Sequence, residues 1–271
     1  MRSPDRTACV GVAAALVVIA LVAGWVAAPR LFARRDPYAV DPDATYRPPS
    51  SAHWFGTDSL GRDVFARVVY GAAASVPAAL LAVGVALVVG GLLGLLAGYF
   101  RGGVEDVVTR IVDVLLSVPS FLLAMSLITT VGFGTVNVAL AVGVVSIGSV
   151  ARLMRAEVLR IGSRPYITAA RVSGRGHLAV LSLHVLPNAA RPVAALAALE
   201  FAAAVLGISA LSFLGFGAAP PSPEWGALIA AGRGSVSTEW WLSIAPGAVI
   251  AVVVIAVNVL SSYLQPKEAG I

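Results

Sequence analysis

The sequence predicts an all-α integral membrane protein with six transmembrane helices. Hydrophobic residues make up 58% of the 271 residues and charged residues only 12%, whereas about 25% of the residues in soluble domains are charged. The mean hydropathy is correspondingly high, at +0.89. A bilayer core of about 30 Å requires about 20 helical residues. Six apolar runs approach or exceed that length, at residues 8–28, 75–100, 107–131, 136–151, 193–215 and 241–264.

Each run is expected to form a helix, because unpaired backbone groups are costly in hydrocarbon. Glycine and alanine are scattered through the runs and favour close contact between helices. The first run follows Arg2 and Arg6, as the apolar part of a signal peptide would. It is longer than the usual apolar part of about 7 to 15 residues, and Pro29 stands where cleavage would be needed. We therefore expect an uncleaved membrane anchor.

The residues needed for common metal and enzymatic sites are missing. The single cysteine, Cys9, excludes an internal disulfide and a cysteine-rich metal site. None of His53, His177 and His184 has a second histidine four residues away, so we expect no metal site. The phosphate-binding G-x4-G-K-[ST] loop requires a lysine, and the chain has only Lys267, near its C-terminus. The chain is predicted not to be an enzyme and to have no catalytic residues.

The arginines predict the orientation of the chain. Seven lie between the fourth and fifth runs beside a single acid, Glu157, namely Arg152, Arg155, Arg160, Arg164, Arg171, Arg175 and Arg191. This loop is therefore expected in the cytoplasm, together with both termini of a multi-pass plasma-membrane protein. Residues 29–74 are placed outside despite their six arginines, because the opposite orientation would export the seven arginines almost without acids. The net charge of +5 thus sets orientation, and nothing indicates nucleic-acid binding.

This topology divides the chain into four parts. They are a cytoplasmic end with a peripheral first helix (1–28), an extracytoplasmic segment (29–74), a core of five transmembrane helices (75–264) and a cytoplasmic tail (265–271). The core includes a cytoplasmic loop at residues 155–190.

Two stretches outside the membrane have informative patterns. Asp58 can cap an amphipathic helix with Leu60 and Phe65 on its apolar side. Such a helix would lie on the outer membrane surface, and a solvated loop is the alternative. The stretch P-P-S-P-E-W is rigid through its three prolines and has Glu224 and Trp225 at the outer interface. Tryptophan there ordinarily anchors a protein in the membrane, and docking of a partner is the alternative.

The stretch I-T-A-A-R-V-S-G-R-G-H-L-A-V-L-S-L-H-V-L-P-N, at residues 167–188, interrupts the apolar chain with arginine and glycine. Ser163 can cap a short helix that has Pro165 in its first turn, and Gly174 can end it. A second, partly apolar segment is expected to end at Pro187, before the fifth span. Either the arginines of this loop only hold the topology, or the short helix is a docking element whose small residues let a partner approach closely.

Four polar residues lie inside the predicted spans: Asp113, Asn137, Glu200 and Asn258. Charges within a membrane are costly, and they usually face protein or a water-filled path. Asp113 is near the inner end of its span, so we expect it to pair with Arg110 or with another group on the cytoplasmic side. Glu200 lies deeper. It either borders a translocation path or pairs with a partner subunit.

The pattern T-A-A-x3-G-x9-H-x-L-P at residues 168–187 resembles the E-A-A-x3-G-x9-I-x-L-P loop of permease subunits in binding-protein-dependent ABC importers. Thr168 stands where that family usually has Glu, and His184 where it usually has Ile. In the family this loop forms the coupling helix, which sits in a cleft of the ATP-binding subunit. The residues thereby implied in coupling are Thr168, Ala169, Ala170, Arg171, Gly174, Leu186 and Pro187.

Two further segments narrow the resemblance. H-W-F-G-T-D-S-L-G-R-D-V, from residue 53, is similar to the G-T-D-x-x-G-R-D-V segment of the dipeptide/oligopeptide/nickel permease family. L-S-F-L-G-F-G-A-A-P-P-S-P-E-W-G, from residue 211, looks like the L-S-F-L-G-x-G-x-x-P-P-x-P-x-W-G segment of that family. Ile147 and Ile208 depart from its pattern, in which a tryptophan and an acid are usual. The resemblance covers most of residues 53–258.

The resemblance implies a type I ABC importer permease fold and a role as the transmembrane permease subunit of an ATP-driven peptide importer. Its implied partners are a second homologous permease subunit, two ATP-binding subunits that hold ATP and Mg, an extracytoplasmic substrate-binding protein and membrane lipid. This chain itself is expected to need no cofactor. The implied path residues are Asn137, Glu200 and Asn258, and the implied binding-protein contacts are Pro221, Pro223, Glu224 and Trp225.

Two alternatives to a peptide importer remain at this point. The same class of importer could take nickel chelates or haem as cargo. A stand-alone channel or secondary carrier belongs to a different class, which is expected to have internal repeats or charged residues across several spans. The sequence has neither of these features.

Overall fold

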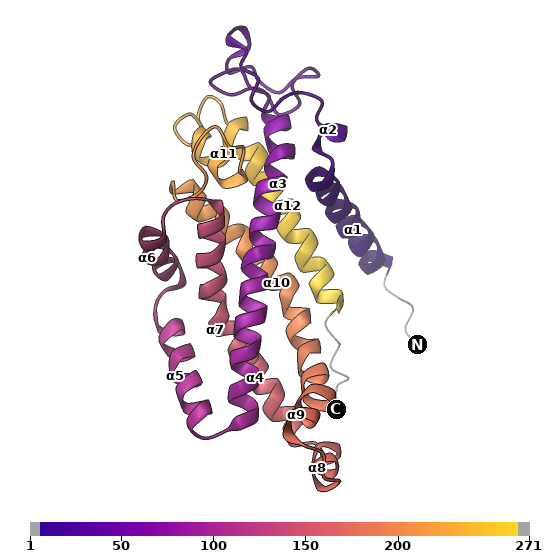
Figure 1. Ribbon diagram of the computed structural model, residues 1–271. Helices are drawn as coiled ribbons and strands as arrows, with labels where there is room; N and C mark the ends of the chain where they lie inside the picture. The colour runs from indigo at the N-terminus through magenta and orange to yellow at the C-terminus, as the bar shows by residue number, and fades with distance from the viewer. Residues whose placement is uncertain (1–5, 265–271) are drawn as a thin grey trace.

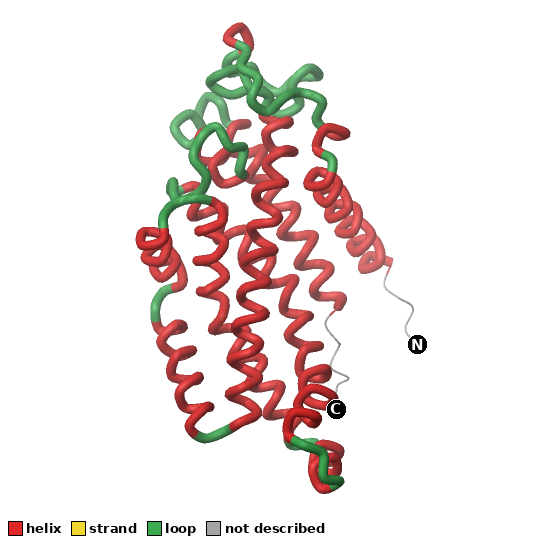
Figure 2. The backbone as a smooth tube through the Cα atoms, in the orientation of Figure 1, coloured by secondary structure: helices red, strands yellow, loops and turns green. Residues whose placement is uncertain are grey.

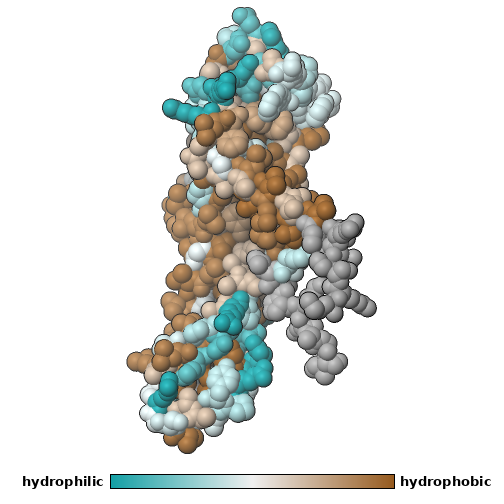
Figure 3. Space-filling view, turned by 90° about the vertical axis from the view of Figure 1, so that its right-hand side faces the viewer, coloured by the Kyte–Doolittle hydropathy of each residue, from teal (hydrophilic) through white to brown (hydrophobic). Residues whose placement is uncertain are grey.

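The structure, a computed structural model, describes residues 6–264. That part of the chain consists of helices joined by loops, without a β-strand. The long helices run side by side along the molecule, and most of the loops gather at one end (Figures 1 and 2). Hydrophobic side chains cover much of the middle of the face seen in Figure 3, and hydrophilic ones gather towards its two ends. This distribution is typical of a membrane protein.

Five helical stretches are long and apolar enough to cross a membrane, and a bent pair of helices supplies a sixth candidate. The predicted all-α membrane fold is therefore confirmed, and α1 and α12 closely match the first and last predicted spans. The five stretches are α1 (Arg6–Ala27), α3 to α4 (Val64–Phe100), α7 (Thr135–Gly162), α9 to α10 (His177–Phe213) and α12 (Trp241–Leu264).

The two ends of the bundle differ in construction. We name the loop-rich end, residues 28–63 and 214–240, the cap (Figure 1). We name the opposite end, residues 163–176, the tip. The cap contains α2 (Pro29–Phe32), the 3-10 turn η1 (Pro42–Ala44) and α11 (Trp225–Gly232), and the tip contains α8 (Pro165–Val172).

The second span is longer than predicted and starts in the cap. Asp63 begins it as N-cap, with its carboxylate accepting the N–H of Ala66 at 2.8 Å. Asp58 instead accepts the N–H of Leu60 in a turn, at 2.9 Å. The predicted surface helix is therefore wrong, because its apolar residues form the first turns of the span. The span comprises α3 (Val64–Val85), the π turn η2 (Ala86–Gly90) and α4 (Gly91–Phe100).

The third predicted span, residues 107–131, is two helices, α5 (Gly103–Ser117) and α6 (Ser120–Val131), at 96° to each other. The single helix predicted there is wrong. Pro119 lacks an N–H and disfavours the helical conformation in the residue before it. Val118 accordingly has extended dihedral angles, φ −86° and ψ 132°.

The helix α7 lies at the centre of the bundle and contacts α3, α4, α5, α6 and α10. Glycines at every fourth position of the second span, Gly90, Gly94 and Gly98, pack against it. A Cβ atom on Gly94 would lie 2.3 Å from the carbonyl oxygen of Ala151. The two helices can approach this closely because no side chain separates their backbones. This pattern fixes the second and fourth spans against each other.

The fifth span begins in the tip region and runs through Pro187 without ending there. It comprises α9 (His177–Val180), the π turn η3 (Leu181–Val185) and α10 (Leu186–Phe213). The prediction that Pro187 stops the helix is wrong. The wider π turn ends at Val185, two residues before Pro187, where the chain loses one backbone donor. The side chain of Asn188 donates to the carbonyl of His184 at 2.7 Å and supplies one bond at this irregular site.

Candidate functional site

The tip is a short helix held on the bundle by one buried side chain. The helix α8 begins at Pro165, as predicted. The hydroxyl of Ser163 donates to the carbonyl of Arg160 at 2.9 Å, so it serves the end of α7 in place of the predicted cap of α8. Ile167 is fully buried and belongs to an apolar cluster with residues of α7, α9 and α10, including Val158. The rest of α8 is free to present a surface.

That surface is made of small and apolar residues. Thr168 and Ala169 are exposed, and Ala170 is half-buried against the bundle. The side chains of Val172 and Leu178 are 83% and 76% exposed. Large apolar side chains grouped at the end of a molecule indicate a contact site. The side chain of Arg171 lies outside the described part of the structure.

The tip turns back towards the bundle at Gly174, which has φ +78°. The N–H of Arg175 bonds to the carbonyl of Ala170 at 3.3 Å, which closes the end of α8 around this glycine. The guanidinium of Arg175 also lies 3.1 Å from Nε2 of His184, on the fifth span. Glycine is therefore required for the turn.

The seven predicted coupling residues do not form one patch. Five of them, from Thr168 to Gly174, lie in the tip. Leu186 and Pro187 are exposed on the fifth span, about 14 Å along the helix from its start at His177. Their side chains are thus separated from the surface of α8.

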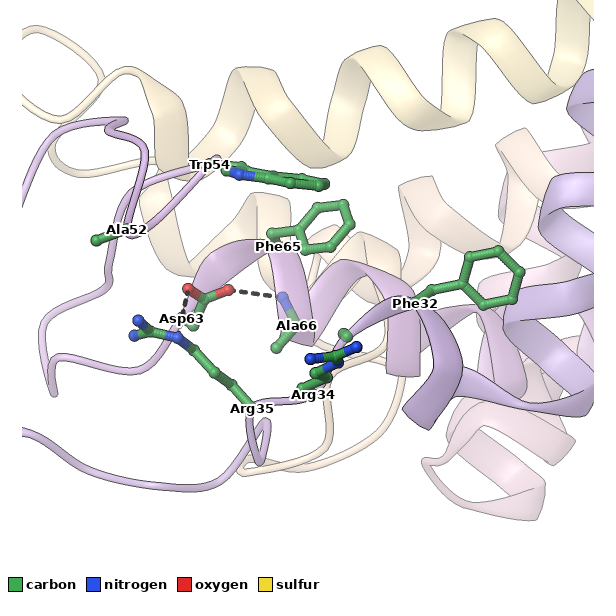
Figure 4. Close-up of a pocket in the computed structure, with 9 residues that line it drawn as sticks. Phe32, Arg34, Arg35, Ala52, Trp54, Asp63, Phe65 and Ala66 are labelled. Atoms are coloured by element: carbon green, nitrogen blue, oxygen red, sulfur yellow. Dashed lines mark hydrogen bonds and ion pairs between the residues drawn. The ribbon is translucent and has the colours of Figure 1, made fainter.

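Ion pairs at the cap and the start of α3 bring three of the arginines predicted outside the membrane close to two carboxylates. Nε of Arg62 lies 2.7 Å, and Nε of Arg67 3.8 Å, from the same carboxylate oxygen of Asp58. Arg35 extends towards Asp63 at 4.0 Å, beside a pocket of about 170 Å³ (Figure 4). The carboxylate of Asp63 also forms a hydrogen bond with Nδ1 of His53, at 2.8 Å. These contacts fold the segment between the first two spans onto the start of α3.

The segment before α11 is locked into the cap by Glu224 and Trp225, both fully buried. The carboxylate of Glu224 accepts the N–H groups of Gly226 and Ala227, each at 3.0 Å. The hydroxyl of Ser75, on α3, donates to Glu224 at 3.3 Å and accepts the N–H of Trp225 at 3.1 Å. Burial raises the pKa of Glu224, and the hydrogen bonds oppose this shift.

Three of the four residues predicted to contact a binding protein are thus buried within this chain, and the contact itself stays a prediction. Pro223, Glu224 and Trp225 are buried in the conformation described, and the indole N–H of Trp225 bonds to the carbonyl of Val68 at 2.9 Å. Trp225 is therefore not a membrane anchor. Pro221 is exposed, so its contact with a binding protein stays a prediction.

The polar residues inside the spans have different surroundings. Asn137 donates to the carbonyl of Gly132 at 3.1 Å and so closes the turn between α6 and α7. Asn258 is half-buried on α12. Glu200 accepts the hydroxyl of Ser149 at 2.9 Å.

Asp113 pairs with Arg152 at 3.2 Å rather than with Arg110. From the sequence, Arg152 was expected in the cytoplasmic loop. It lies inside α7, because that helix extends to Gly162. Neither Arg152 nor Ser149 was predicted as a site residue. Arg152 was missed because the helix extends beyond its apolar run, and Ser149 because its partner Glu200 is 51 residues away in sequence.

Residues 90–269 match the family described as binding-protein-dependent transport system inner membrane component. The chain belongs to this family. The match spans the tip and all helices from α4 onward, and the function of a membrane-embedded permease component follows from it. The permease is therefore a multi-pass membrane protein.

Relatives of the permease include proteins named as bacterial peptide transport permeases. It is 37% identical over 263 residues to the probable D,D-dipeptide transport system permease protein DdpC of Escherichia coli K12, covering 96% of this chain and 88% of the relative. It is also 37% identical over 261 residues to the di/tripeptide transport system permease protein DppC of Pseudomonas aeruginosa, covering 92% and 82%. The glutathione transport system permease protein GsiD of Pectobacterium atrosepticum is 37% identical over 256 residues, covering 94% and 85%.

A solved structure supports the fold independently. The permease superposes on a chain from the crystal structure of an amino acid ABC transporter with histidines, with a TM-score of 0.58. The sequences are 16% identical, and the alignment covers 73% of this chain and 92% of the other. Together with the family match, this confirms the expected ABC importer permease fold.

Proposed function

We propose that this chain is one of two homologous permease subunits in an ATP-driven peptide importer. It forms half of the translocation path and docks an ATP-binding subunit on its tip. The observation that carries the proposal is the exposed surface of α8, which is built of small and apolar residues on a helix anchored by Ile167. A short helix that presents small side chains, such as those of Thr168 and Ala169, can approach a cleft of a partner closely.

The energy source lies outside this chain under the proposal. Two ATP-binding subunits hold ATP and Mg and act on the tips of the two permease subunits. An extracytoplasmic binding protein delivers the cargo to the cap. The family description, which names binding-protein-dependent transport, supports both kinds of partner.

The proposed orientation places the tip and both termini in the cytoplasm and the cap outside. The tip carries arginines and no acid between residues 163 and 176, which favours the cytoplasm. At the cap and the start of α3, Asp58 and Asp63 offset two of the three charges of Arg35, Arg62 and Arg67. The cap arginines therefore oppose this orientation less than their number suggests.

The proposed cargo is a short peptide. The names of three relatives refer to dipeptides, di- or tripeptides and glutathione, which is itself a tripeptide. These relatives are similar to this chain over nearly its whole length, including the cap and the helices that would border the path.

Reconstitution of the complete transporter tests the proposal. The chain, its permease partner, the ATP-binding subunits and the binding protein are assembled in lipid vesicles, and uptake of a labelled dipeptide is measured. We expect uptake that requires both ATP and the binding protein. Uptake that continues without ATP would instead identify a channel or secondary carrier. Omission of the binding protein provides the matched control.

A further inference from the structure

One exposed face of the bundle carries charges of both signs at membrane depth. On α10, Glu200 accepts the hydroxyl of Ser149, on α7, at 2.9 Å. One turn further along α7, Arg152 pairs with Asp113, on α5. The side chains of this pair are 63% and 59% exposed. The face thus consists of neighbouring polar groups from α5, α7 and α10.

These groups lie well inside the spans. At about 1.5 Å per residue, Ser149 is about 21 Å along α7 from its start at Thr135, and Glu200 is about 20 Å from the other end of its helix, Phe213. Both distances fall within a hydrocarbon core about 30 Å thick. Charges at this depth face protein or water rather than lipid. The face therefore borders either the path or the second permease subunit.

The charge of Glu200 is not balanced within the described chain. Among the residues whose side chains the structure describes, which leaves out Arg6 and Arg171, no arginine, lysine or histidine lies within ion-pair distance of its carboxylate. The hydroxyl of Ser149 is a neutral donor with one hydrogen, for which the carbonyl of Ser146 and the Glu200 carboxylate compete, each at 2.9 Å. A carboxylate in such a site binds a cationic donor strongly, because charge-assisted hydrogen bonds gain strength where water is scarce.

We propose that Glu200 receives the amino group of the peptide cargo in the translocation path, which makes it a residue that selects cargo with a free amino terminus. This inference rests on the proposed function. Peptides of different sequence share the ammonium group, the main chain and the carboxylate, so a path for many peptides has only these groups to recognise. The Ser149 hydroxyl, which lies 2.9 Å from both the carbonyl oxygen of Ser146 and the Glu200 carboxylate, is the neighbouring polar group on α7. Arg152 and Asp113 together add no net charge.

The first test measures whether position 200 faces water in the assembled importer. Cys9, the only cysteine, is replaced by serine, and Glu200→Cys is treated with a charged, water-soluble thiol reagent. We expect the thiol introduced at position 200 to be labelled. Saturating dipeptide, supplied with the binding protein, should slow the labelling at least fivefold. Val17→Cys is the control. Val17 is 67% exposed on the peripheral helix α1, where it would face lipid, so it should stay unlabelled. Absence of labelling at position 200 in every nucleotide state would place Glu200 against the second permease subunit and overturn the proposal.

The second test compares cargoes. Uptake of a dipeptide and of its des-amino analogue is measured at concentrations that saturate the binding protein. We expect Glu200→Gln to slow the dipeptide about tenfold and to leave the analogue unchanged. Glu157→Gln, a carboxylate paired with Arg160 near the end of α7, should slow neither cargo. An equal loss for both cargoes in Glu200→Gln would show a structural role instead. If the unaltered importer takes up no peptide, the proposed function itself fails, whereas the labelling result still reports on the path.

Discussion

Glu224 offers the sharpest test of how the cap is held together. Its carboxylate accepts the N–H groups of Gly226 and Ala227 at the start of α11 and the hydroxyl of Ser75 on α3. Replacement by alanine removes the acceptor for all three donors at once. Replacement by glutamine keeps one acceptor oxygen and removes the charge. Alanine therefore loses the charge and every acceptor, whereas glutamine loses the charge but can keep the oxygen that accepts from Ser75 and Gly226.

The expected loss can be worked from these contacts. A lost N-cap costs about 0.5 to 2 kcal/mol, and each buried donor left without a partner costs about 1 to 3 kcal/mol. Relief of the buried charge offsets part of this loss, since burial already disfavours the ionised form of Glu224. We expect Glu224→Ala to lower the free energy of unfolding by about 2 to 4 kcal/mol, and Glu224→Gln by about 1 kcal/mol or less.

The same residue predicts a pH dependence. Its pKa in the folded protein is raised above the ordinary value of 4.5, mainly by burial. Between these two pKa values the folded state holds a proton that the unfolded state has released. Stability therefore falls as pH rises through this window and is recovered on acidification. Glu224→Gln cannot titrate, so this contribution to the pH slope should disappear in that variant.

The measurement is the melting temperature of the detergent-solubilised complex at several pH values. For a chain of this size, 2 to 4 kcal/mol corresponds to a decrease of about 10 °C. The reasoning is refuted if Glu224→Ala has the same melting temperature as the parent protein. It is also refuted if the melting temperature of Glu224→Gln is as low as that of Glu224→Ala. In either case the bonds to Gly226 and Ala227 do not hold the cap.

Three further predictions concern the tip and the helix contacts. Gly174→Val should assemble normally but lose binding-protein-stimulated ATP hydrolysis, because φ +78° is strained for valine although no atom crowds the new Cβ; unchanged stimulated hydrolysis would contradict this. Since Ala170 packs partly on the bundle, Ala169→Trp is the cleaner test of docking. It should release the ATP-binding subunits on purification, whereas Arg175→Ala should retain them, because exposed pairs contribute only about 0 to 1 kcal/mol; the reverse order would make the interface electrostatic. Gly94→Val should reduce the amount of folded permease in the membrane severalfold, because its Cβ would collide with the backbone of α7; normal levels would show that the two helices can separate.

The apolar runs predicted the fold class and most of the spans because a bilayer imposes length and hydrophobicity on each of them. They could not predict where helices continue outside the hydrocarbon. The second span starts at Val64 and α7 ends at Gly162, both beyond their apolar runs. Nothing in the hydropathy of those flanking turns distinguishes a helix from a loop. Arg152 was assigned to a loop for this reason.

Two prolines show why local rules did not decide the helix boundaries. Pro119 breaks the third span, whereas Pro187 lies inside a continuous helix. Pro187 follows a π turn and has a neighbour, Asn188, whose side chain bonds to a backbone carbonyl. The residue before Pro119 is extended, and the helix restarts after it. Whether a proline ends the helix or lies inside it depends on the packing around that proline, and this packing involves residues distant in sequence.

The burial of Glu224 and Trp225 could not be predicted for a related reason. The prolines before them favour an exposed turn, and the partner that buries them, Ser75, is about 150 residues away in sequence. The tip was better predicted because its features are local: the proline that starts α8 and the glycine that ends it lie within ten residues of each other.

The fifth span connects the three regions that the proposed mechanism needs. It starts beside the tip at His177, carries Glu200 about 35 Å further along, and ends near the cap at Phe213. The tip is anchored to it through the buried contact of Ile167 and the contact of Arg175 with His184. Packing between helices is close, and side chains in such interfaces resist continuous deformation. A displacement of α8 by an ATP-binding subunit must therefore either break these contacts or move the helix that holds Glu200. Only the second outcome couples ATP hydrolysis to the path, so the stability of the contacts around Ile167 sets how much force the tip can transmit.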